Sequence, residues 1–155
     1  MTTRELGIQY ALAAAGASTC PKASVGAVIV DTHGRHFTGW NGAPLGWPTC
    51  RDVGCRDDGE SHGPTHIHAE VRAILHAGKR ANGAMLYTSQ RPCHRCISIA
   101  NLAGIFQIEY PGGTIRFTLD SSTPTHGSLS VADISPRCSS ALARYPSRPS
   151  SGLTQ

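Results

Sequence analysis

The feature that most constrains the fold of this chain is a pair of short motifs that together can bind one metal ion. The first motif is His68-Ala69-Glu70, and the second is Pro92-Cys93-His94-Arg95-Cys96. One imidazole and two thiolates make three ligands, and a catalytic zinc site keeps its fourth position open for water. Glu70 then remains a free carboxylate that can move a proton. The fold must therefore bring two separate segments together at one site.

The residues around each motif predict the N-terminus of a helix. Apolar residues follow Glu70 at helical intervals up to Gly78, namely Val71, Ile74 and Leu75. Cys93 and Cys96 lie three residues apart, which places them on one face of a second helix that begins just after Pro92. The dipole and free amides of a helix N-terminus favour a thiolate over a thiol. A lone Cys-x-x-Cys could be a redox pair or half of a structural zinc site, but here both motifs occur together.

The remaining apolar segments predict an α/β domain. A helix is expected over residues 3–17 with Leu6, Tyr10 and Ala14 on one stripe, and strands are expected over residues 25–30, 36–40, 84–89 and 105–110. A turn at residues 31–34 should make the first two strands antiparallel neighbours, and residues 41–65 should be irregular. This order of elements is typical of two or three layers in which helices cover a mixed sheet.

Composition narrows the class of protein further. A chain of 155 residues can bury a core without disulfides, so the six cysteines are better explained by metal binding. The net charge is +4, and the 14 Lys and Arg residues form no basic run interleaved with aromatics, which argues against nucleic-acid binding. No signal peptide and no membrane-spanning run is recognisable, so we expect a cytoplasmic protein without a membrane partner.

The composition changes near residue 120 to Ser, Thr, Pro, Gly and Arg with few large apolar residues. We therefore expect one zinc-dependent domain over residues 1–118. Residues 119–155 should form a Ser-, Pro- and Arg-rich extension that is partly disordered.

The two motifs match the H-x-E and P-C-x-x-C signature of the zinc-dependent base deaminases. More specifically, the chain resembles the deoxycytidylate (dCMP) deaminases of phages and bacteria over roughly residues 4–110. The segments that carry this resemblance are residues 20–30, 39–46, 67–75, 83–88, 92–96 and 103–105. The segment Gly39-Trp40-Asn41-Gly42-Ala43-Pro44-Leu45-Gly46 is the specific one, because the cytidine, guanine and tRNA-adenosine branches do not share it. The resemblance implies a cytidine-deaminase-like three-layer α/β/α fold with a mixed sheet.

The resemblance also implies an activity, the hydrolysis of dCMP to dUMP and ammonia. Zinc-bound hydroxide would attack C4 of cytosine, and Glu70 would protonate N3 and then the leaving amine. Asn41 would hold the sugar 3′-hydroxyl, although a turn-forming asparagine before Gly42 is the alternative interpretation. Ala69 would offer backbone groups to the base edge. Lys22 lies near the phosphate-binding segment, but a solvated lysine explains it equally well.

A second, structural zinc is expected from the same resemblance. Its four ligands would be Cys20, Cys50, Cys55 and His62. Phage members of the family carry such a zinc, with ligands at the positions of Cys20, Cys50 and His62. Their fourth ligand, a histidine near Asp58, is absent here, so Cys55 would replace it in a closed Cys₃His site. The alternatives are a buried apolar Cys20 with the other three merely exposed, or His66 in place of His62.

Many relatives are hexamers regulated by dCTP and dTTP through the loop after Asn41. The resemblance therefore implies a homo-oligomer, and a magnesium ion could accompany a nucleotide effector, although regulation does not follow from the motif alone. The chain departs from the family after its last expected strand. There Tyr110-Pro111-Gly112-Gly113 breaks the orderly sheet and helix that relatives keep, which leaves the far wall of the pocket undetermined.

Three other functions remain open at this point. A deaminase of another small base or nucleotide, such as dCTP, a modified cytosine, a pterin-like or a riboflavin-pathway substrate, would keep the zinc chemistry, but Asn41-Gly42 argues against it. A nucleic-acid editing deaminase would need a basic channel or an aromatic platform. A non-catalytic zinc-binding interaction module would have no use for Glu70.

Overall fold

A five-stranded mixed sheet forms the centre of the computed structural model, which describes residues 1–54 and 66–117. The strands are β1 (Gly26–Val30), β2 (His36–Trp40), β3 (Met85–Thr88), β4 (Gln107–Tyr110) and β5 (Gly113–Arg116). Their order across the sheet is β2-β1-β3-β4-β5, and only β3 and β4 pair in parallel among these strands. Cys55, His62 and residues 119–155 lie outside the described residues.

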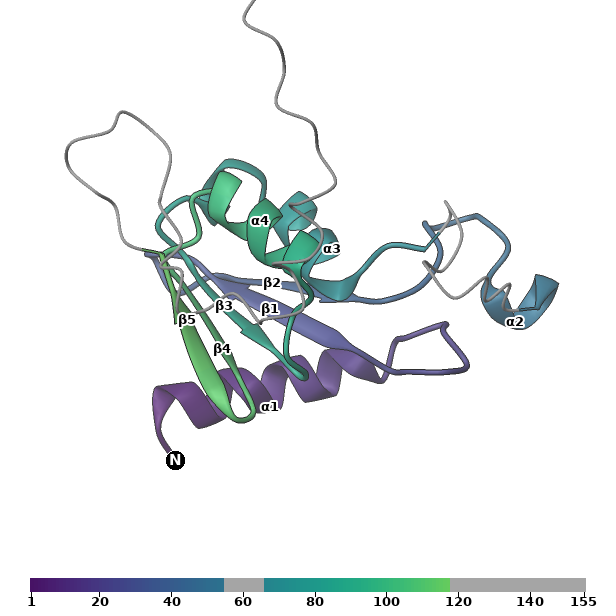
Figure 1. Ribbon diagram of the computed structural model, residues 1–155, viewed down its shortest axis with the longest axis horizontal. Helices are drawn as coiled ribbons and strands as arrows, with labels where there is room; N and C mark the ends of the chain where they lie inside the picture. Colours follow the sequence, from purple (N-terminus) through teal and green to yellow (C-terminus); the bar gives the residue numbers. More distant parts are fainter. Residues whose placement is uncertain (55–65, 118–155) are drawn as a thin grey trace, which may run out of the picture.

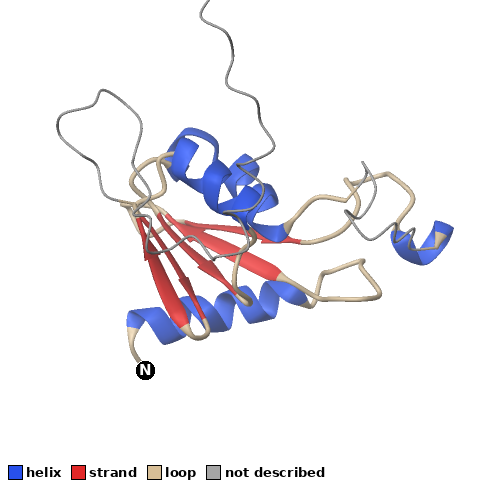
Figure 2. Ribbon diagram, in the orientation of Figure 1, coloured by secondary structure: helices blue, strands red, loops and turns tan. Residues whose placement is uncertain are grey.

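Helices cover both faces of this sheet. Helix α1 (Thr3–Ala15) lies on one face, and α3 (Ala69–Ala77) and α4 (His94–Leu102) lie on the other (Figure 1). The short helix α2 (Cys50–Val53) stands apart from the sheet, and the 3-10 helix η1 (Gly78–Ala81) follows α3. Figure 2 shows the resulting three layers, helix, sheet and helix. The expected three-layer architecture with a mixed sheet is thus confirmed.

The buried face of α1 is not the one that the sequence pattern predicted. Leu6 and Tyr10 are 38% and 40% exposed, and the buried residues of α1 are Gly7, Ala11 and Ala15. The reason is a close approach between helix and sheet. A Cβ atom on Gly7 would lie 2.3 Å from the ring of Tyr87 in β3, so only small residues fit on this face.

Helix α3 approaches the sheet just as closely on the other face. A Cβ atom on Gly39 of β2 would lie 2.2 Å from the carbonyl oxygen of Ala69 and 2.5 Å from the nitrogen of Ala73. Glycine is thus required where the first turn of α3 contacts β2. The apolar pattern predicted for α3 holds for Ile74, which is buried, but Leu75 is 67% exposed. The helix buries Glu70 and Arg72 instead.

The segment after the last expected strand is ordered, which corrects the prediction of a break there. Tyr110-Pro111-Gly112-Gly113 forms a tight turn with Gly112 at φ 100°, and β5 then pairs antiparallel with β4. The guanidinium of Arg4 in α1 secures this hairpin. Its Nε donates to Oε2 of Glu109 at 2.7 Å, and its terminal nitrogen donates to the carbonyl oxygen of Tyr110 at 3.0 Å.

No helix in residues 1–54 and 66–117 combines the length and apolar character that crossing a bilayer would require.

Candidate metal centre

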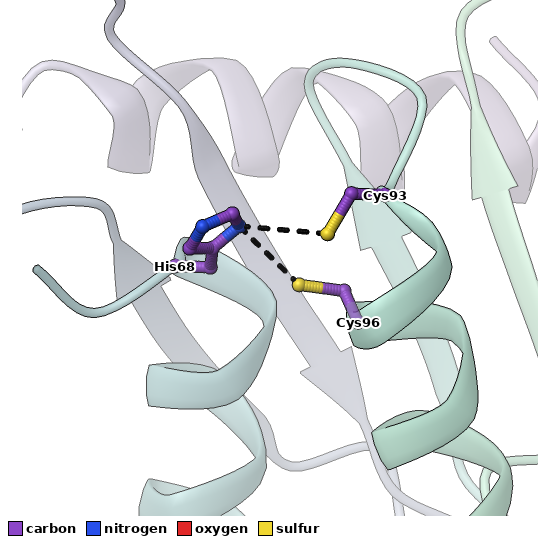
Figure 3. Close-up of side chains that lie close together, drawn as sticks. All are labelled: His68, Cys93 and Cys96. Atoms are coloured by element: carbon purple, nitrogen blue, oxygen red, sulfur yellow. Dashed lines mark hydrogen bonds between the residues drawn. The ribbon is translucent and has the colours of Figure 1, made fainter. Parts of the chain in front are cut away.

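The three predicted metal ligands all lie at helix N-termini. His68 is the N-cap residue of α3, Cys93 is the N-cap residue of α4, and Cys96 lies in the first turn of α4. Both N-cap residues have extended backbones, with φ and ψ of −71° and 150° for His68 and of −74° and 163° for Cys93. Neither side chain caps its helix, so both side chains are directed to the space between the helices (Figure 3).

The distances between the three side chains match those expected around one zinc ion. Nδ1 of His68 lies 3.8 Å from Sγ of Cys93 and 3.5 Å from Sγ of Cys96. All three ligand atoms lie within 4.8 Å of one another. A tetrahedral zinc with its usual Zn–S and Zn–N bond lengths holds such atoms about 3.6 Å apart. Since Cys93 and Cys96 carry free thiols, this donor set fits zinc.

Glu70 lies beside this ligand group, as its place in the motif predicted. The residue is only 4% exposed, and the thiol of Cys96 donates to its Oε2 over 3.5 Å. Burial, and after it the negative charge of Glu70, raises the pKa of the Cys96 thiol above its ordinary value. A bound metal ion reverses this effect, because it requires the thiolate and compensates its charge. Metal binding would therefore make the thiolate form of the buried Cys96 favourable.

A cavity of about 170 Å³ opens next to this group. Glu70, Ala69 and Asn41 line it, together with the ligand residues His68 and Cys93. The structure thus places the predicted substrate-contacting residues Asn41 and Ala69 at the same cavity as the metal group. Five further residues line the cavity without having been predicted to do so, namely Ala23, Val25, His66, Gln90 and Arg91. Gln90 and Arg91 could have been found from their position between the expected strand and Pro92.

The side chain of Asn41 is buried and takes part in three hydrogen bonds within the protein. Its Oδ1 accepts from the hydroxyl of Ser18 at 2.6 Å and from the backbone N–H of Val25 at 2.8 Å. Its Nδ2 donates to the carbonyl oxygen of Ala23 at 2.8 Å. The amide therefore fixes the loop of residues 18–25 to the end of β2. Within residues 1–54 and 66–117, the second N–H of the Asn41 amide is left for another partner.

The remaining residues that the sequence proposed for substrate or zinc binding lie in two places. Lys22 and Cys20 belong to the loop of residues 18–25, and Cys50 and His66 come after Asn41 in the chain. Lys22 is exposed, and it is not one of the described residues that line the cavity. Cys20 is buried in the loop of residues 18–25, and Cys50 is the half-buried first residue of α2. His66 packs edge-on against the ring of His68, with the ring centroids 5.8 Å apart.

Comparison with known proteins gives consistent matches. Residues 1–110 match the family model described as the cytidine and deoxycytidylate deaminase zinc-binding region. The deoxycytidylate deaminase of Mycobacterium phage D29 is 37% identical over 117 residues, which cover 68% of this chain and 90% of that protein. ComE operon protein 2 of Bacillus subtilis is 40% identical over 98 residues, covering 60% of this chain and 50% of its own length.

A solved structure agrees with these matches in fold. The dCMP deaminase of cyanophage S-TIM5, crystallised in complex with dCMP and dUMP, superposes with a TM-score of 0.59 at 28% identity. The superposition covers 71% of this chain and 82% of the phage protein.

Proposed function

The chain belongs to the zinc-binding family of cytidine and deoxycytidylate deaminases, and from this premise we propose that it hydrolyses dCMP to dUMP and ammonia. The observation that carries this proposal is the placement of Glu70. Its buried carboxylate lies 3.5 Å from a sulfur of the metal group, at a cavity that Asn41 also lines. The phage relatives that are named dCMP deaminases support the choice of substrate.

His68, Cys93 and Cys96 would hold the zinc ion, and a zinc ion held there activates water for attack on C4 of cytosine. Glu70 is the proton carrier of this chain. Its carboxylate takes the proton of the attacking water, gives it to N3 of the base, and then assists the departure of the amino group as ammonia. Because Glu70 is almost fully buried, bulk water does not compete for these protons.

Three further residues are assigned to the base, the sugar and the phosphate of the nucleotide. Ala69 is the first residue of α3, where backbone N–H groups lack intrahelical partners, so its N–H can bind the edge of the base. The one uncommitted N–H of Asn41 is assigned to the sugar 3′-hydroxyl. Lys22 is assigned to the 5′-phosphate, because it is exposed on the loop that Asn41 fixes in place.

The proposal is tested by measuring ammonia release from dCMP, dCTP, deoxycytidine and single-stranded DNA side by side. We expect dCMP to be the best substrate, because a site built to bind a phosphate leaves buried polar groups unpaired when the phosphate is missing. Equal kcat/KM for deoxycytidine and dCMP would eliminate the phosphate contact. Preferential release from single-stranded DNA would indicate a nucleic-acid editing enzyme instead.

We also propose a second, structural zinc bound by Cys20, Cys50, Cys55 and His62. Cys20 supports this site because it is buried in the loop that borders the cavity, and a Cys₃His set makes a closed four-coordinate site. Metal analysis should find two zinc ions per chain, and one in the Cys50→Ser variant with the catalytic ion retained. One zinc per chain in fully loaded wild-type protein would contradict the second site.

The same family resemblance extends the proposal to assembly and regulation. We infer a cytoplasmic homo-oligomer, hexameric as in many dCMP deaminases, with dCTP and dTTP as effectors and magnesium accompanying the bound effector. Sedimentation with and without dCTP and magnesium tests both the assembly and its response.

A further inference from the structure

We propose that Arg72 is a positioning residue that holds the Asn41 loop, defined as residues 40–43, against the helix that carries Glu70. Arg72 is the fourth residue of α3 and lies two positions after Glu70. No role for Arg72 follows from the sequence motifs. Its effect on catalysis, though not its effect on the loop, rests on the proposed function.

The guanidinium of Arg72 is buried, and three of its hydrogen bonds to described residues go to carbonyl oxygens of this loop. The residue is 4% exposed, and its Nε donates to the carbonyl oxygen of Trp40 at 2.8 Å. One terminal nitrogen donates to the carbonyl oxygens of Gly42 and Ala43 at 3.2 Å and 2.8 Å. The guanidinium carbon also lies 5.0 Å from the centre of the Trp40 ring. A planar group with several fixed donors is suited to gather carbonyl groups in this way.

These contacts attach the Asn41 loop to the chain on both sides of His68. Gly42 pairs with Ile67, the residue before His68, through two backbone hydrogen bonds of 3.0 Å and 2.9 Å. Arg72 attaches the same loop to the helix on the other side of His68. The loop is therefore held both before and after the ligand residue that begins α3. Because His68 does not cap the helix, these attachments take over part of the work of fixing its first turn.

Asn41 is the part of the loop that this arrangement places. Arg72 binds the peptide group before Asn41 through the carbonyl oxygen of Trp40, and it binds the peptide group after Gly42 through the carbonyl oxygen of Gly42. The N–H of Gly42, which belongs to the peptide group between these two, donates to the carbonyl oxygen of Ile67. Asn41 and Glu70 both line the cavity. Arg72 thus sets the distance between the proposed sugar contact and the proton carrier, without itself touching the substrate.

Arg72→Lys is the variant that tests this role. Lysine keeps the charge but has a single nitrogen, so it cannot serve Trp40, Gly42 and Ala43 at their separate positions. We expect KM for dCMP to rise about tenfold through the loss of charged hydrogen bonds. The kcat should change by less than about threefold, because Glu70 and the three ligands stay on their helices, and zinc content should not change.

Arg4→Lys is the matched control. The guanidinium of Arg4 also donates to backbone carbonyl oxygens, those of Tyr110 and Gly113 at 3.0 Å and 3.3 Å. Both carbonyls belong to the β4–β5 hairpin and lie outside the Asn41 loop. The control should therefore leave KM as in the wild type, even if it lowers overall stability by a similar amount.

Hydrogen exchange supplies a measurement that does not depend on any substrate. In Arg72→Lys the amides of Gly42 and Ile67 should lose protection, while those of β1 and β3 keep it. Unchanged protection at Gly42 and Ile67 overturns the proposal, as does a uniform loss of protection over the whole domain. If the loop loosens but KM stays at the wild-type value, the positioning role is also overturned. If the wild type does not act on dCMP, the proposed function fails and the exchange result alone decides the role of Arg72.

Discussion

The N-termini of α1 and α3 solve the same structural problem in opposite ways. At α1, the hydroxyl of Thr2 accepts from the backbone N–H of Glu5 at 3.2 Å, and the carboxylate of Glu5 accepts from the backbone N–H of Thr2 at 2.7 Å. At α3, the N-cap position is taken by His68, whose side chain makes no such bond. The first helix satisfies its own end. Helix α3 has no side-chain cap, and the side chain of its N-cap residue belongs to the metal group instead.

The two glutamates in these first turns sharpen the comparison. Glu5 is exposed and completes the capping box of α1, whereas Glu70 is buried and contacts the thiol of Cys96. Helix α4 follows α3 in this respect, since its N-cap residue Cys93 is also a metal-group residue without a capping bond. Both helix ends at the metal group thus lack the side-chain capping bonds that α1 has. In the metal-bound protein, the ion would connect these two ends instead.

The largest effect is expected from His68→Asn, which turns the open end of α3 into a capped one. Asparagine is a good N-cap residue, but it removes the imidazole ligand. We expect the loss of one zinc per chain and no detectable deamination. The metal-free Asn variant should nevertheless be more stable than metal-free His68→Ala by about 1 kcal/mol. Metal analysis and urea unfolding measure both effects, and an Asn variant that kept its catalytic zinc would contradict the comparison.

Glu70→Gln should have the next largest effect. Glutamine keeps the shape of the side chain but cannot carry a proton, so turnover should fall at least about a hundredfold with zinc still bound. The matched control is Glu5→Gln in the first turn of α1, where glutamine can still complete a capping box. This control should keep full activity. Retention of most turnover by Glu70→Gln would show that the buried carboxylate is structural.

The smallest effect is expected from Thr2→Ala, which opens the end of α1 in the way that α3 is open. Loss of the capping bonds should lower the free energy of unfolding by about 1 kcal/mol. Because α1 lies across the sheet from the metal group, kcat and KM for dCMP should stay at their wild-type values. Thermal or urea unfolding and steady-state kinetics test this pair of statements. A changed KM would show that the two faces of the sheet are coupled.

The metal group was predictable from the sequence because its residues are of rare types at fixed spacing. The predicted ligands His68, Cys93 and Cys96 lie together as expected, and Glu70 lies beside them. The role of Arg72 was not predictable, because its partners are backbone carbonyl groups of a loop about 30 residues earlier, and backbone acceptors leave no trace in a sequence.

Two parts of the fold were also predicted incorrectly, for a common reason. The buried face of α1 carries Gly7, Ala11 and Ala15, and a hydrophobic pattern points to larger residues such as Leu6. The sequence Tyr110-Pro111-Gly112-Gly113 predicts a break in the sheet, whereas this segment forms the turn between β4 and β5. In both places the small residues serve a close backbone approach or a positive φ, and neither requirement can be judged before the neighbouring segments are known.

The glycines Gly26 and Gly39 have a consequence for how this protein can vary. On Gly26 a Cβ atom would lie 2.0 Å from the carbonyl oxygen of Ala11 in α1, and on Gly39 it would lie 2.2 Å from that of Ala69 in α3. At these two points the spacing of the layers is set by main-chain atoms. Side-chain substitutions elsewhere in the core can therefore accumulate without changing the height of the first turn of α3 above the sheet. The chemistry at that turn therefore tolerates substitutions in the rest of the core as long as Gly39 gains no carbon atom, whereas Gly26 sets the spacing of α1 on the opposite face.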